Sequence, residues 1–140
     1  LFRLPGYPFT PGEVAAHIAY GRIDWFSRMG ADGAAALARE IAPLFPYGRP
    51  EPRLTADPAW IVGWLERGWE MVAANLARWT VDDLDATYRQ AYRGEVYAVS
   101  RQWTLFRILA HDIQHGGQLT VLLGAQGIAL PELWDQGGHL

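Results

Sequence analysis

Two histidines, His111 and His115, lie four residues apart in an apolar stretch that is typical of a helix. Four residues make about one helical turn, so both imidazoles project from the same face. Such a face points inward, because its other positions carry mainly apolar side chains; these are Thr104, Ile108, Leu119 and Leu122. Two buried imidazoles need partners, and neutral imidazole is a good ligand for zinc, nickel, copper and iron. The pair therefore predicts a metal site between packed helices.

His17 is the natural third ligand. It lies on the apolar stripe of an earlier predicted helix, and Gly21, one turn later, leaves room beside it. Three histidines from two helices leave at least one coordination position open, which is typical of catalytic rather than structural zinc sites. Water bound at an open position has its pKa lowered towards neutrality. We therefore expect His17, His111 and His115 to hold one divalent ion.

Each of these residues also has a simpler interpretation. A single histidine on an apolar face is more often a hydrogen-bonded core residue than a ligand, and two histidines four residues apart also occur by chance. Asp24, two turns after His17, could accept a hydrogen bond from a ligand imidazole or be solvated. Gln118, three residues after His115, could face the site or make a structural hydrogen bond. His139 lies in a glycine-rich tail and is not expected to bind metal.

The composition restricts the class of protein. A chain of 140 residues with 50% hydrophobic residues is long enough for one domain, spanning 1–140, with a substantial core. The net charge of −3 argues against a nucleic-acid surface. Cysteine is absent, which excludes disulfides and thiolate ligands and fits a reducing compartment. There is no apolar run of membrane-spanning length and no signal-peptide pattern, so we expect a cytoplasmic protein.

Helical periodicity dominates the chain. Thr10, Pro11 and Glu13 form a capping box with proline at the first helical position, and Asp57-Pro58 repeats the capping signal. Core and interface are the expected places for the closely spaced Trp60, Trp64 and Trp69. Helices are expected at Pro11–Met29, Asp32–Leu44, Pro58–Trp79 and Arg101–Leu123. A loop is expected at Phe45–Thr55, and Tyr88–Val99 is expected to be an extended connection across the bundle. The predicted fold is therefore an all-α bundle.

The closing helix resembles a known family motif. The segment HDIQHGGQLTVLLGAQGIALP, from His111 to Pro131, is similar to the end of the DinB-like (YfiT-like) metalloproteins, with His-x3-His, then Gly-Gln-Leu, then Gly and Pro. Val14-Ala-Ala-His17-Ile-Ala, followed by Asp24 and Trp25, looks like the second-helix motif of that family. The resemblance covers almost the whole chain.

This resemblance implies an up-down-down-up four-helix bundle, commonly dimeric. It also implies a divalent ion, zinc or nickel, bound by His17, His111 and His115. Two features depart from the family pattern. Only a short segment precedes Thr10, so we expect the family's first long helix to be missing or replaced. Gly116 stands where relatives often carry Arg or His.

Characterised relatives are thiol S-transferases that use bacillithiol or a similar low-molecular-weight thiol, and a mycothiol-dependent isomerase. The leading hypothesis is therefore a metal-dependent thiol S-transferase or hydrolase that acts on a small molecule. The alternative is a non-catalytic, metal-binding stress-response bundle that serves as a dimeric scaffold. A di-iron site is less favoured, because no Glu-x-x-His pattern occurs and Asp112 is expected on the wrong side of its helix. No second catalytic side chain is evident.

We also expect a homodimer. The chain is rich in tryptophan and lacks an obvious first helix, so its exposed apolar surface should be covered by a second subunit or by sequence outside this chain.

Overall fold

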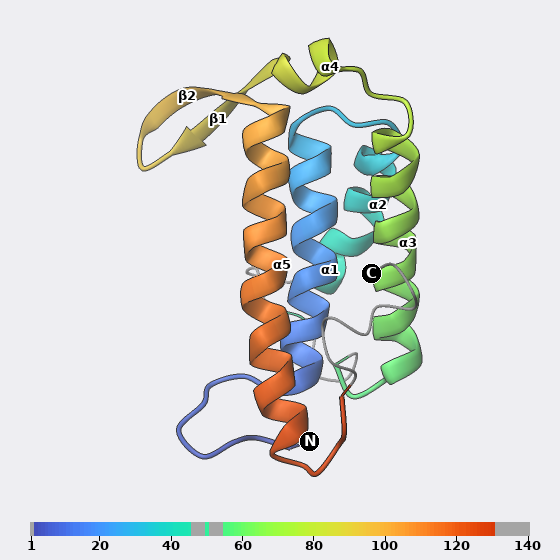
Figure 1. The fold of residues 1–140 in the computed structure, drawn as a ribbon, viewed down its shortest axis with the longest axis vertical. Helices are drawn as coiled ribbons and strands as arrows, with labels where there is room; N and C mark the ends of the chain where they lie inside the picture. The colour runs from blue at the N-terminus through green and yellow to red at the C-terminus, as the bar shows by residue number, and fades with distance from the viewer. Residues whose placement is uncertain (1, 46–49, 51–54, 131–140) are drawn as a thin grey trace.

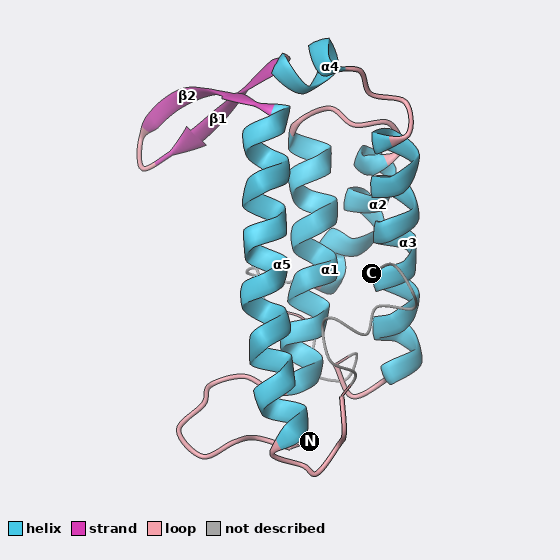
Figure 2. Cartoon of the chain, viewed as in Figure 1, coloured by secondary structure: helices cyan, strands magenta, loops and turns pink. Residues whose placement is uncertain are grey.

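The computed structural model describes residues 2–45, 50 and 55–130 (Figure 1). It is mainly helical, as Figure 2 shows by colour. The elements in chain order are α1 (Pro11–Arg28), α2 (Ala34–Ile41) with the 3₁₀ turn η1 (Ala42–Leu44), α3 (Pro58–Leu76), α4 (Val81–Asp85), β1 (Thr87–Tyr92), β2 (Glu95–Ser100) and α5 (Arg101–Gly124). The prediction of an all-α bundle is confirmed.

Helix α1 is the centre of the bundle. It packs against α2, α3 and α5, and the three long helices run side by side in Figure 1 with α1 between α5 and α3. Its most deeply buried large side chains are Ile23 and Phe26. Phe26 stacks on Trp79, with ring centroids 5.7 Å apart, and so joins the end of α1 to the segment that follows α3. A helix that is covered on several sides provides a rigid base for any side chain that it directs towards a neighbour.

Capping residues fix where the long helices begin. The Thr10 hydroxyl accepts from the backbone N–H of Glu13, whose carboxylate accepts from the backbone N–H of Thr10. Asp57 caps α3 by accepting from the first turn, and the Ser100 hydroxyl accepts from the Trp103 N–H at the start of α5. Each side chain satisfies N–H groups that would otherwise have no partner in the helix. The predicted starts at Thr10 and Asp57 are confirmed.

Two helix boundaries differ from the predictions. The helix expected from Asp32 begins only at Ala34, because Gly33 has a left-handed φ of 77° that a helix cannot contain. The helix expected to reach Trp79 ends at Leu76, and Trp79 instead turns back onto Phe26. The closely spaced tryptophans were expected in the core or at an interface. Trp64 is buried, whereas Trp69 is 57% exposed.

The extended segment is a hairpin, not a connection across the bundle. Strands β1 and β2 pair in antiparallel fashion, from Thr87 opposite Ser100 to Tyr92 opposite Glu95. The turn residues Arg93 and Gly94 both have positive φ, 51° and 86°, as two-residue hairpin turns require. The hairpin lies at the end of the bundle where α5 starts (Figure 1). The prediction missed the turn because it treated the whole stretch as one extended segment.

No helix among the described residues is long and apolar enough to cross a membrane. His139 and Pro131 lie outside those residues, as does most of the predicted loop between Phe45 and Thr55.

Candidate metal centre

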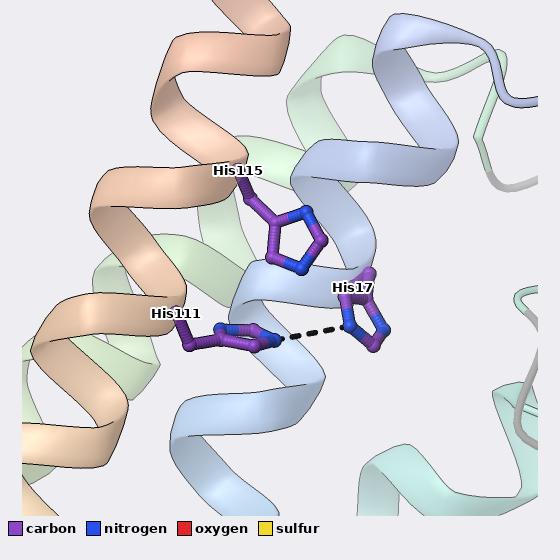
Figure 3. Close-up of side chains that lie close together, drawn as sticks. All are labelled: His17, His111 and His115. Atoms are coloured by element: carbon purple, nitrogen blue, oxygen red, sulfur yellow. Dashed lines mark hydrogen bonds between the residues drawn. The ribbon is translucent and has the colours of Figure 1, made fainter. Parts of the chain in front are cut away.

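The three histidines singled out from the sequence converge in space. His17 comes from α1, and His111 and His115 come from α5, with their rings directed at one another (Figure 3). The ring centroids are 4.4 to 4.9 Å apart. The Nε2 atoms of His17 and His111 are 3.0 Å apart, and one nitrogen from each ring falls within a set whose members all lie within 4.8 Å of one another. The three imidazoles could therefore share one ion.

Gly21 makes this convergence possible. A Cβ at position 21 would lie only 2.9 Å from Cε1 of His111, which is closer than real Cβ atoms come to other carbons. Gly21 lies one turn after His17 on α1. The imidazole of His111, from α5, therefore lies close to α1 beside His17, where α1 has no side chain. Room beside His17 was expected from the sequence. The structure shows that His111 fills this room.

Asp112 orients His111, a role that the sequence reasoning missed. The Asp112 Oδ1 lies 3.2 Å from Nδ1 of His111, and the Nε–H of Arg22 donates to the Asp112 Oδ2 at 2.6 Å. Asp112 was expected to point away from the histidines, which counted against a role as a bridging metal ligand. In the structure its carboxylate nevertheless contacts the imidazole of the preceding residue, His111. The signal that could have found it is the adjacent His111-Asp112 pair.

Asp24, for which the sequence left open a role as acceptor or as a solvated carboxylate, forms an ion pair instead. Its Oδ2 pairs with Arg28, four residues later on the same helix, at 2.7 Å. In the structure, therefore, the acceptor beside a ligand imidazole is not Asp24. Asp24 thus has its ion-pair partner one turn away on its own helix.

Gln118 faces the site, one of the two possibilities that the sequence left open. Its Oε1 lies 2.6 Å from Nδ1 of His115. Carboxylate and amide oxygens can only accept, so the Nδ1 atoms of His111 and His115 both carry the proton and donate. In the neutral form of each ring the lone pair is then on Nε2, and the Nε2 of His111 points at His17. This is the tautomer that histidine metal ligands need.

The electrostatics keep His17 neutral. Burial first, and then the neighbouring His111 and His115, lower the pKa of His17 from its ordinary 6.5 to about 4, against a weaker opposite effect of Asp112. Burial raises the pKa of Asp112, but hydrogen bonds from His111 and Arg22 outweigh it and hold that pKa below its usual value. Near neutral pH the site therefore offers an uncharged imidazole at His17 and an anionic carboxylate beside His111.

The donor set fits a divalent ion. Three neutral imidazole nitrogens suit zinc or nickel, and without a cation or a shared proton between them their lone pairs would repel. The group can hold a metal ion, and three protein ligands would leave room in the coordination shell for a further molecule.

A cavity of about 230 Å³ opens beside the histidines and gives access to them. His17 and His115 form part of its wall, together with Phe9, Glu13, Val14, Pro50 and Gln118. The wall combines the apolar side chains of Phe9, Val14 and Pro50 with polar groups near the imidazoles. This is the usual composition of a small-molecule site.

Comparison with protein families identifies the chain. The family model of the DinB superfamily matches residues 1–119, which include α1, His17, His111 and His115. The chain belongs to the DinB superfamily. No curated protein and no solved structure matches it. The resemblance drawn from the two histidine motifs is thus confirmed. The matched residues also include Asp112 and Gln118, which accept hydrogen bonds from the two α5 imidazoles.

Proposed function

We propose that this DinB-superfamily protein binds one divalent metal ion, zinc or nickel, through His17, His111 and His115, and that it is a metal-dependent thiol S-transferase or hydrolase. The observation that carries the proposal is that the three imidazoles converge and that two of them, those of His17 and His115, form part of the wall of a cavity. An ion bound there would supply a Lewis acid that lowers the pKa of a thiol or a water molecule.

The chain's own residues have separate tasks in this proposal. His111 and His115 are held in the ligating tautomer by Asp112 and Gln118, and Arg22 keeps Asp112 ionised and in place. The lowered pKa of His17 leaves it available as a ligand without first losing a proton. Each ligand is thus oriented or deprotonated before an ion arrives.

The cavity determines what can reach the site. Phe9, Val14 and Pro50 provide apolar contact, and Glu13 and Gln118 provide polar groups. A substrate would place its apolar part against the first three and its reacting atom beside the imidazoles. The thiol partner would be a reduced low-molecular-weight thiol, such as bacillithiol, in the cytoplasm.

Metal content tests the first half of the proposal. Protein without a histidine tag is analysed for bound metal after dialysis, as wild type and as His17→Ala, His111→Ala and His115→Ala. We expect about one ion per wild-type chain and a strong loss in each variant, because two neutral ligands hold a labile ion weakly. His139→Ala is the control and should keep the ion. Full metal content in His17→Ala with loss in His139→Ala would show that the third ligand is wrong.

A reaction screen tests the second half. The metal-loaded protein is assayed for transfer of a low-molecular-weight thiol to electrophiles and for hydrolysis of small esters and amides. Turnover that disappears in His115→Ala but survives in His139→Ala would support an enzyme. Stoichiometric metal with no turnover for any thiol or hydrolysable substrate would favour the alternative, a non-catalytic metal-binding scaffold.

A further inference from the structure

A second cavity lies where the hairpin meets α1 and α5, at the end of the bundle where α5 starts (Figure 1). Its volume is about 800 Å³, which is in the usual range for small-molecule sites. It shares no lining residue with the cavity beside the histidines. On α5 its wall includes Trp103, eight residues or about 12 Å of helix before His111. The two cavities therefore occupy different levels of the same pair of helices.

Four aromatic side chains line this second cavity: Trp25 from α1, Trp103 from α5, and Tyr92 and Tyr97 from the hairpin. The rings of Trp25 and Trp103 meet edge to face, with their centroids 6.5 Å apart. Tyr92, Tyr97 and Trp103 are each about half exposed, so their rings are available to a ligand. Aromatic rings gathered around a cavity favour a ligand that also has a flat, apolar ring system.

The charge at the second cavity is positive. Its described lining residues include two arginines, Arg28 and Arg107, and no carboxylate. Arg28 already pairs with Asp24 at 2.7 Å, and its guanidinium lies over the ring of Trp25. Arg107 has no hydrogen-bond or ion-pair partner within the described part of the chain. The cavity therefore offers one guanidinium whose charge no protein carboxylate balances.

Arg107 is also well placed beside the aromatic wall. It lies four residues after Trp103 on α5, so both side chains project from the same face of the helix. Other polar side chains of the wall already have partners: the Gln90 amide donates to the carbonyl of Ala91, and the Ser100 hydroxyl accepts from the N–H of Trp103. A guanidinium can bind both oxygens of a carboxylate or sulfonate. Arg107 is therefore the group that would fix the anionic end of a ligand.

We propose that the second cavity binds a small aromatic anion, a molecule with a flat ring system and one carboxylate or sulfonate group. The ring system packs among Trp25, Trp103 and the two tyrosines of the hairpin, and the anionic group pairs with Arg107. A neutral aromatic molecule would leave Arg107 without a partner, and a small inorganic anion would leave the aromatic rings exposed. An aromatic anion uses both features. This site does not depend on the metal centre or on the reaction proposed there.

Two dyes that differ by one group test the role of Arg107. Anilinonaphthalene sulfonate and phenylnaphthylamine have the same rings, and only the first carries a sulfonate. Each is titrated by fluorescence into the metal-loaded full chain. Arg107→Gln should weaken binding of the sulfonate about tenfold, the order of one charge-assisted hydrogen bond, and leave the neutral dye unchanged. Arg39→Gln is the matched control and should change neither affinity, because Arg39 is an exposed arginine on α2.

Truncation of the aromatic wall tests the location. Trp103→Ala should weaken both dyes by about threefold or more, since a stacking ring is lost. Tyr97→Ala should do the same, and it leaves the contact between α1 and α5 intact because Tyr97 is on the hairpin. Circular dichroism of both variants should match wild type. His115→Ala, which alters the metal centre, should leave both affinities unchanged.

Three results would overturn the proposal. The first is a wild-type chain that binds neither dye. The second is an equal loss of both dyes in Arg107→Gln, which would show that the charge of Arg107 is not recognised. The third is binding that falls in His115→Ala but survives in both Trp103→Ala and Tyr97→Ala, which would place the dyes at the metal centre.

Discussion

The imidazole of His111 occupies the space that a side chain at position 21 would fill. The contact joins the middle of α1 to the middle of α5, and an added Cβ on Gly21 would lie 2.9 Å from Cε1 of the ring. The atom in the way belongs to the tip of a side chain that can move, not to backbone. A side chain at position 21 should therefore disturb the site more than the fold.

Gly21→Ala should weaken metal binding by at least about tenfold, the order seen when groups that orient a ligand are lost. Its free energy of unfolding without metal should change little, because displacement of His111 opposes the helix-propensity gain of about 1 kcal/mol. Isothermal titration with zinc and urea unfolding measure the two effects. Gly63→Ala on α3, where a Cβ meets nothing within 4 Å, is the control and should gain stability with unchanged metal affinity. Equal zinc affinities for the two variants would contradict this reading of Gly21.

Asp112→Ala should lower metal affinity about 10- to 100-fold, because His111 loses the acceptor that fixes its tautomer. It also leaves Arg22 without its 2.6 Å partner, which should cost about 1–2 kcal/mol of stability in this half-buried setting. Asp24→Ala removes an ion pair within α1, the one with Arg28, and should leave metal affinity unchanged. If Asp24→Ala weakened metal binding as much as Asp112→Ala, our assignment of the acceptor would be wrong.

Asn75→Ala should destabilise the protein by about 1–3 kcal/mol. The Asn75 side chain is 1% exposed. It accepts from the backbone N–H of Asp32 and donates to the carbonyls of Asp32 and Met71, so it fastens the turn after α1 to α3. Arg78→Ala, which removes an exposed ion pair with Asp32, should cost less than about 1 kcal/mol. Urea unfolding of both variants measures the difference, and a larger loss for Arg78→Ala would be inconsistent with this role.

Without metal, the free energy of unfolding should fall as the pH falls from about 6.5 to about 4. The pKa of His17 is about 4 in the folded chain and 6.5 ordinarily, so between these values the unfolded state binds the additional proton and is favoured as protons become available. Above pH 6.5 both states are neutral at this residue and the contribution is flat. Urea unfolding of the metal-free protein across this range measures the slope. His17→Gln should reduce it, and an unchanged slope in that variant would show that His17 is not responsible.

Most of the architecture could be predicted from local signals. The capping residues Thr10 and Asp57 act within one turn of their own helices, so their effect is visible in the sequence. The convergence of the three histidines could also be predicted, since a four-residue spacing fixes one face of α5 and the apolar stripe of α1 fixes the other.

What could not be predicted depends on contacts between distant residues. Arg22 and Asp112 are 90 positions apart, and nothing near either of them indicates that they pair. Asp24 was one possible acceptor because it lies two turns after His17 along α1, but its position relative to α5 depends on how the helices pack. The hairpin was missed for a different reason, since a turn of Arg93 and Gly94 gives only a weak local signal.

The candidate site is built from two segments that are far apart along the chain, with 94 positions between His17 and His111. When only α5 has formed, it presents His111 and His115 one turn apart to an ion, and His17 is not yet in place as the third ligand. Bringing α1 onto α5 requires closing this long loop, which is slow and costly in entropy. If α1 docks after the rate-limiting step, zinc should leave the refolding rate almost unchanged and slow the unfolding rate. Stopped-flow measurements with and without zinc would show whether the ion accelerates formation of the native topology or only stabilises it after it has formed.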